Sequence, residues 1–204
     1  MPAPADTCGL DLAEGWPRLS PSDEQRKVSM SGRWMLLAAL ALPTAAWSQA
    51  PQVPADGLLV VVVRHAEKAQ DDPRDPGLSD AGLARAAALA ERLHELPLAA
   101  VYATPFRRTQ LTAQPSAAAQ GLEIEVREFV SRDPDEDALA LRETLLREHR
   151  GEAVLVVGHS NTVPAIVEAL SGEEAEAMPE TEYDRLSLIR IEADGRVELR
   201  VERY

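Results

Sequence analysis

A continuous run of leucine and valine at residues 58–63 restricts the fold of this chain more than any other feature. The run is Leu-Leu-Val-Val-Val-Val, and the polar pair Arg64-His65 follows it directly. Unbroken β-branched runs of this length are typical of strands buried on both faces of a parallel sheet. We therefore predict a central parallel strand that is covered by helices on both sides, with Arg64 and His65 at its carboxyl end.

The rest of the chain alternates between helical and extended patterns. We predict helices from Ser79 to about Glu95, from Pro105 to about Gln120, from Asp133-Pro134 to about Arg150, and from about Asn161 to Leu170, with strands at 99–103, 122–127 and 153–157 and a terminal hairpin at 185–192 and 196–203. Pro115 is expected to end or kink its helix, because proline removes a backbone donor. This order predicts an α/β fold, a three-layer α/β/α sandwich with a mostly parallel sheet.

The first 57 residues differ in composition from the rest. Residues 1–29 are polar and lack apolar periodicity, which predicts a disordered tail or a start codon assigned upstream of the true one at Met30. Residues 30–50 combine a short basic start, an apolar run and small residues at the end, which is the layout of a secretory signal peptide. A buried or membrane-resting helix is the alternative for this segment.

These segments predict where the protein acts. The apolar run is shorter than the ~20 residues that span a bilayer, so no stable membrane anchor is expected. We expect an exported, periplasmic protein in which residues 51–57 form a linker and residues 58–204 form one catalytic domain.

Charge and cysteine content narrow the class of function. The formal net charge of -13 would repel nucleic acids and anionic lipids, because binding them requires a basic surface. A phosphorylated ligand would need a local cluster of arginine and histidine instead. The single cysteine, Cys8, excludes an intramolecular disulfide, a CxxC redox motif and a cysteine zinc site.

Three polar segments follow predicted strands. They are Arg64-His65, Thr104-Pro105-Phe106-Arg107-Arg108, and Gly158-His159-Ser160. Ligands of open α/β sheets bind beyond the carboxyl ends of the strands, so we expect these segments to meet at one edge. Two histidines with at least one arginine are a suitable set of side chains for a phosphate group.

This ordered set resembles the histidine phosphatase superfamily, which has the phosphoglycerate-mutase-like fold. Arg64-His65-Ala66 resembles the family's Arg-His-Gly motif with alanine in place of glycine, and residues 104–113 resemble its Ser-Pro-x-x-Arg-Ala-x-Gln-Thr-Ala motif, which places the family arginine at Arg108. Gly158-His159 is similar to the context of the second family histidine, and residues 78–82 to the Leu-Thr-x-x-Gly helix entry. The resemblance extends from about residue 58 to the C-terminus.

The resemblance implies a phosphomonoester hydrolase that needs no metal and no cofactor. His65 would attack phosphorus and form a phosphohistidine, while Arg64, Arg108 and His159 would neutralise the phosphoryl oxygens. The acid that protonates the leaving group is open. Asp133 is the positional candidate, although Asp133-Pro134 also suits a helix N-cap, and Glu67 and Glu128 are alternatives. The sequence suggests no catalytic role for His94 or His149, which are expected at surface helix ends.

The same residues could also serve other functions. The segment around Ser160 is similar to a hydrolase nucleophile elbow, but Thr162 replaces its second glycine and no histidine follows Ser160. A metal-dependent hydrolase would use His65, Glu67 and His159. A phosphomutase and a catalytically weak phosphate-binding domain remain alternatives on the same fold. The expected ligand is a small phosphorylated substrate or a phosphoprotein.

Overall fold

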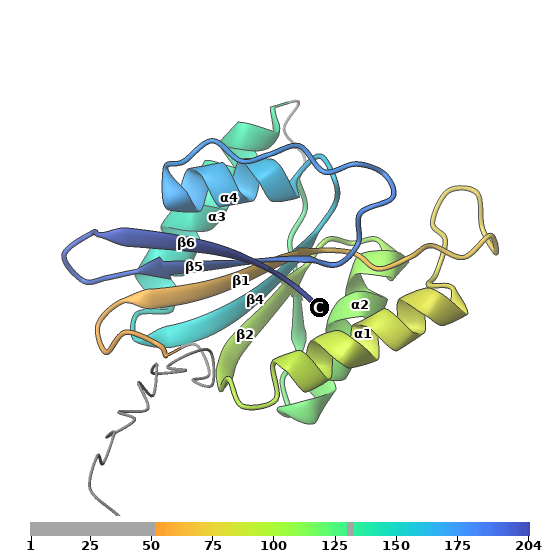
Figure 1. Cartoon of the computed structure of the whole chain (residues 1–204), viewed down its shortest axis with the longest axis horizontal. Helices are drawn as coiled ribbons and strands as arrows, with labels where there is room; N and C mark the ends of the chain where they lie inside the picture. Colours follow the sequence, from red (N-terminus) through yellow and green to blue (C-terminus); the bar gives the residue numbers. More distant parts are fainter. Residues whose placement is uncertain (1–51, 130–132) are drawn as a thin grey trace, which may run out of the picture. The chain divides into compact units, whose positions relative to one another are not determined.

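A mixed β-sheet forms the middle layer of the protein in its computed structural model, which describes residues 52–129 and 133–204 (Figure 1). The predicted tail and signal peptide lie outside the described residues. The described elements are β1 (Leu58–Arg64), α1 (Asp80–Arg92), β2 (Leu98–Ala103), α2 (Arg107–Ala119), β3 (Ile124–Val126), α3 (Pro134–Glu148), β4 (Glu152–Gly158), α4 (Val163–Ser171), β5 (Arg185–Ile191) and β6 (Val197–Arg203). None of the described helices is long and apolar enough to cross a membrane.

The strand order is β3-β2-β4-β1-β5-β6. Parallel pairing joins β1 to β4, β4 to β2, and β2 to β3. The terminal hairpin adds two antiparallel strands, because β5 pairs with β1 and β6 with β5. Helices α1 and α2 cover one face of the sheet, and α3 and α4 cover the other (Figure 1). The predicted three-layer fold is confirmed, with a parallel part and an antiparallel edge.

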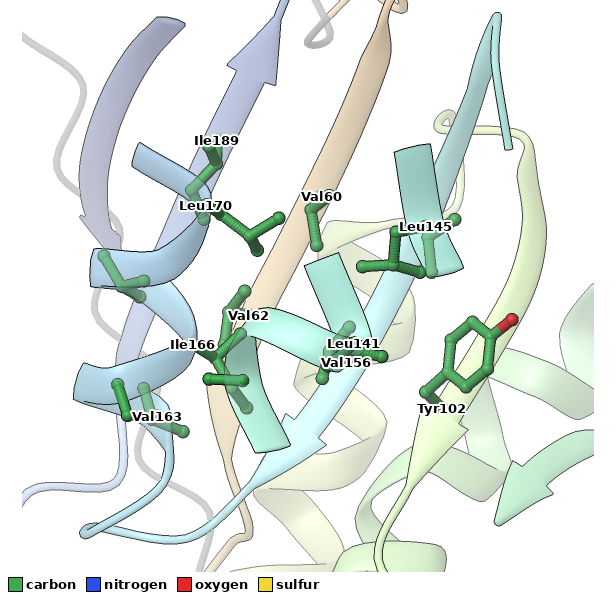
Figure 2. Packing of buried hydrophobic residues seen from close by; sticks show 14 of the residues in the cluster. Val60, Val62, Tyr102, Leu141, Leu145, Val156, Val163, Ile166, Leu170 and Ile189 are labelled. Carbon is green, nitrogen blue, oxygen red and sulfur yellow. The ribbon is translucent and has the colours of Figure 1, made fainter. Parts of the chain in front are cut away.

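The valines of β1 serve two cores because successive side chains of a strand point to opposite faces. Val60 and Val62 pack with residues of α3 and α4, as Figure 2 shows, whereas Val61 and Val63 pack with residues of α1 and α2. All four valines are fully buried. The apolar run at residues 58–63, predicted to be the central strand, therefore contributes to both cores.

Helix α2 differs from the prediction. It begins at Arg107 rather than at Pro105, and it continues to Ala119 with Pro115 inside it. Proline costs the helix one backbone hydrogen bond. The helix nevertheless continues, since Ala113, Ser116 and Ala117 are buried on either side of the proline, where packing outweighs local propensity.

The expected surface position of His149 is wrong. The residue is 9 % exposed, its Nε2 lies 2.9 Å from the hydroxyl of the buried Tyr102, and its Nδ1 lies 2.8 Å from a carboxylate oxygen of Glu152. His149 therefore joins the end of α3 to β2 and β4 by side-chain hydrogen bonds.

Candidate active site

The register of the sheet brings the three polar segments together. Arg64 pairs with Gly158, and Ala103 pairs with Val157, so β1, β4 and β2 end at nearly the same level. The backbone N–H of His65 donates to the carbonyl of Gly158 at 2.9 Å. His65, His159 and Thr104 therefore leave their strands at one edge, as expected from the sequence.

His65 is held as a neutral imidazole with a defined tautomer. Its Nδ1 lies 2.8 Å from the carbonyl oxygen of Ala66. Because a carbonyl only accepts hydrogen bonds, Nδ1 carries the proton and Nε2 keeps its lone pair. Burial lowers the pKa of His65 to about 4, since desolvation disfavours the charged form. At neutral pH His65 is thus uncharged, with a lone pair on Nε2 that is chemically able to act as a nucleophile.

Ala66 stands where the family motif has glycine, next to His65. Ala66 is fully buried and packs with Leu78 and Ala86. Its backbone N–H donates to Oγ1 of Thr112 at 2.9 Å, and that hydroxyl donates to the carbonyl of Arg108 at 2.7 Å. The segment that carries His65 is thereby tied to the first turn of α2.

His159 stands beside His65 and is also neutral. The two rings meet edge to face with centroids 5.4 Å apart. Arg108 can only donate, and its Nη2 lies 3.4 Å from Nδ1 of His159, so Nε2 carries the proton and donates to Oγ1 of Thr104 at 2.9 Å. Burial, together with the smaller effect of the Arg108 charge, lowers the pKa of His159 to about 3. In the ligand-free protein, Nδ1 of His159 therefore accepts from Arg108.

Arg64 binds the segment between α4 and β5, a contact that the sequence did not indicate. The side chain is 1 % exposed, and its Nη1 donates to the carbonyls of Pro179 and Glu182 at 2.9 and 3.0 Å. Its Nη2 donates to Glu180 at 3.0 Å, and its guanidinium lies over the ring of Tyr183. Among the described residues its buried Nε has no hydrogen-bond partner.

Arg108 also keeps a buried donor unused. Its Nε has no partner within the described parts of the chain. Its guanidinium lies 4.2 Å from the ring centroid of Phe106, and its Nη1 is 3.8 Å from Asp75. An unsatisfied buried donor costs about 1–3 kcal/mol. Two such arginine nitrogens beside a neutral histidine are therefore suited to an oxyanion, which would satisfy both.

Two of the candidate acids from the sequence, Glu67 and Asp133, are engaged in hydrogen bonds of their own. Glu67 accepts hydrogen bonds from Arg85 of α1 at 2.7–2.9 Å, and this pairing lowers its pKa and keeps the carboxylate engaged with a helix side chain. Asp133 caps α3 by accepting from the N–H of Asp135. Glu128 is exposed after β3. The geometry favours the N-cap interpretation of Asp133.

Several side chains around the two histidines were missed by sequence reasoning. Thr104 and Phe106 belong to a segment that was recognised for its arginine, and Phe106 packs edge to face on His159 at 5.2 Å. The ring centroids of Tyr183 and His65 are 6.1 Å apart, and the Glu180 carboxylate contacts Arg64. Tyr183 and Glu180 come from the acidic stretch between α4 and β5, where no sequence motif distinguishes a site residue from a solvent-exposed one.

The residues present suit an anion better than a metal. Within residues 52–129 and 133–204, no group of three or more His, Cys, Asp or Glu side chains is arranged to hold a metal ion. Glu67, which a His65–Glu67–His159 metal site requires, is held by Arg85. Ser160 donates to Glu180 rather than pairing with a histidine, which disfavours the serine hydrolase alternative.

Comparison with known families identifies the superfamily of this chain. The sequence profile of the histidine phosphatase superfamily, branch 1, matches residues 60–130 and 133–203. The chain belongs to this superfamily. The matched range includes all four residues of the expected phosphate site, namely Arg64, His65, Arg108 and His159. No curated protein matches the sequence.

Solved structures of the superfamily share the fold. The protein histidine phosphatase SixA, solved with tungstate, is 20% identical, with 71% of this chain and 96% of that chain covered and a TM-score of 0.57. A putative phosphohistidine phosphatase SixA from Agrobacterium tumefaciens is 23% identical over 74% of this chain and 99% of its own, with a TM-score of 0.55. A mycobacterial glucosyl-3-phosphoglycerate phosphatase complexed with VO3 is 16% identical over 71% and 98%, with a TM-score of 0.57.

Proposed function

We propose that this protein is a phosphomonoester hydrolase that works through a phosphohistidine on His65. One observation carries the proposal. The neutral His65, with Nδ1–H bound to Ala66, lies among Arg64 and Arg108, whose buried Nε atoms have no partner in the described structure. This arrangement supplies a nucleophile and oriented positive charge for one tetrahedral oxyanion.

The chemistry follows from these groups. The lone pair on Nε2 of His65 attacks phosphorus, the bond from phosphorus to the ester oxygen breaks, and the leaving oxygen takes a proton. Water then attacks the phosphohistidine, the P–N bond breaks, and its electron pair returns to Nε2. The carbonyl of Ala66 stabilises the Nδ1–H that becomes more acidic while Nε2 is phosphorylated.

Small phosphate esters and phosphoproteins are both candidate substrates. The structural relatives include phosphatases named for phosphohistidine and for glucosyl-3-phosphoglycerate, so the fold serves substrates of different size. Phe106 is 42 % exposed beside His159, and it offers an apolar contact to the organic part of a substrate. Neither feature favours a phosphomutase over a hydrolase.

The test is turnover of an aryl phosphate by the full chain in excess chelator. We expect wild type to be active and His65→Ala to lose at least roughly 10⁴-fold in kcat, because the nucleophile is removed. His94→Ala is the matched control, since His94 is an exposed histidine just after the C-cap of α1, and its Nδ1 lies 2.7 Å from the carbonyl of Glu91.

The possible results separate the alternatives. Retention of activity in chelator supports a metal-independent reaction, and its loss would point to a metal site. Equal activity in His65→Ala and wild type would contradict the phosphohistidine mechanism. A wild type that binds vanadate but turns over no ester would indicate a phosphate-binding domain.

A further inference from the structure

The segment between α4 and β5 brings one carboxylate to the phosphate site. Oε2 of Glu180 lies 3.0 Å from Nη2 of Arg64, and Oε1 accepts from the hydroxyl of Ser160 at 3.0 Å. Arg64 precedes the nucleophile, and Ser160 follows His159. Glu180 therefore bridges the two segments that follow the ends of β1 and β4.

The position of Glu180 is built into the fold rather than left to a free loop. On either side of it, the carbonyls of Pro179 and Glu182 accept from Nη1 of the buried Arg64. Glu182 is in turn held by Arg185 of β5 at 2.7 Å. The backbone is fixed from both sides, while the Glu180 side chain itself is 73% exposed. The carboxylate can therefore exchange protons with water and meet a substrate.

Other carboxylates near the site are committed to structural partners. Glu67 is paired with Arg85. Asp75 accepts from the backbone N–H of Arg107 at the start of α2. The same Asp75 oxygen lies 3.8 Å from Nη1 of Arg108, so Asp75 holds the start of α2. Glu180 contacts Arg64 at 3.0 Å with no backbone group of α2 to hold, so its exposed carboxylate lies next to the reacting centre.

We infer that Glu180 is the proton carrier of the reaction, an inference that rests on the proposed hydrolase function. In the first step the protonated Glu180 gives its proton to the ester oxygen as the P–O bond breaks. In the second step the Glu180 carboxylate accepts a proton from the water that attacks phosphorus, and the P–N bond to His65 breaks. One proton leaves Glu180 and one returns to it in each cycle, so the two reaction steps balance in protons.

The charges around Glu180 explain how one carboxyl group serves both steps. In the ligand-free protein, the Ser160 hydroxyl and the Arg64 and Lys68 charges hold the pKa of Glu180 below its ordinary value. A phosphate dianion on Arg64 opposes these charges, since a neighbouring like charge raises the pKa of a carboxyl group. Substrate binding therefore favours the protonated acid, and departure of the leaving group favours the carboxylate.

The test compares wild type with Glu180→Gln, an isosteric change that keeps a hydrogen-bond acceptor for Ser160. Single-turnover rates of phosphoenzyme formation are measured with an alkyl phosphate, whose leaving oxygen needs a proton, and with a nitrophenyl phosphate, whose leaving group does not. Glu173→Gln is the matched control, because Glu173 is an exposed glutamate of the same segment.

We expect Glu180→Gln to slow phosphoryl transfer from the alkyl ester by roughly 100-fold or more, in the range of general acid catalysis. Transfer from the nitrophenyl ester should stay within about threefold of wild type. Its steady-state turnover should fall because water is no longer activated, so a burst of nitrophenolate and an accumulated phosphohistidine should appear. Glu173→Gln should behave as wild type with both esters.

Two results would overturn the role of Glu180 while leaving the hydrolase intact. One is equal slowing of transfer from both esters, which would mean that Glu180 only positions Arg64. The other is unchanged or faster transfer with a lower KM for both, which would mean that its carboxylate merely competes with phosphate. An inactive wild type would instead refute the proposed function, and the inference with it.

Discussion

The charge state of the two histidines comes from their surroundings rather than from their identity. His65 and His159 are both desolvated, and the cations Arg64, Arg108 and Lys68 disfavour a further positive charge beside them. A protonated His65 would have no lone pair for phosphorus. In the proposed reaction the arginines therefore have two effects, because they attract the phosphate anion and keep His65 unprotonated.

Titration of His65 tests this directly. With a pKa of about 4 against an ordinary 6.5, the imidazole should remain neutral down to about pH 4 in the folded protein. The unfolded chain binds this proton at higher pH, so His65 should reduce folding stability progressively as the pH falls from 6.5 toward 4. NMR of the ring protons in wild type and His65→Ala checks it, and a midpoint near 6.5 would contradict the buried geometry.

The turn from β4 into α4 sets the position of His159. Gly158 ends β4, and the backbone N–H of His159 donates to Oγ1 of Thr162 at 2.9 Å. A Cβ at position 158 would come within 2.8 Å of that same oxygen. The glycine is required here by close approach of a side chain, since its φ is not among the positive values of the described glycines.

Gly158→Ala should therefore displace the Thr162 hydroxyl and, with it, His159. We expect a loss of about 1–3 kcal/mol in the free energy of unfolding from overpacking. We also expect kcat/KM to fall by at least roughly tenfold, because misplaced catalytic groups are costly. Urea unfolding and aryl phosphate kinetics measure the two effects. Gly172→Ala, at the exposed left-handed end of α4, is the comparison, and it should lose stability without loss of activity.

The two cores of the described sheet share their central strands. Leu145 of α3 is buried in one core, and Leu89 of α1 is buried in the other. Both cores pack on β1 and β4, whose residues alternate between them. We therefore expect the two helical layers to unfold together rather than one after the other.

Leu145→Ala and Leu89→Ala should each lower the free energy of unfolding by about 2–5 kcal/mol, since both create a cavity at a fully buried site. Each variant should still unfold in one transition with an unchanged slope in urea. Circular dichroism and hydrogen exchange of amides in both layers provide the readout. A variant in which one layer loses protection well before the other would show that the cores are independent.

The sequence alone predicted the fold class and the place where the site residues meet. The apolar run at 58–63, the N-cap at Ser79 and the terminal hairpin depend on local patterns, so the fold class and the order of elements followed from them. The meeting of His65 with His159 also followed, because carboxyl ends of parallel strands share an edge. These inferences needed only periodicity and topology.

The contacts of individual side chains depended on the tertiary structure. Glu180 lies 116 residues from Arg64 in the chain, and nothing in its local sequence distinguishes it from the exposed glutamates around it. The partner of Glu67 was likewise not predictable from its local sequence. Glu67 follows His65 closely in the chain, but in the folded protein its carboxylate is bound by Arg85. Local pattern determined where the strands end, whereas packing between distant segments decided which charged groups meet there, because hydrogen bonds and desolvation depend on distance in space.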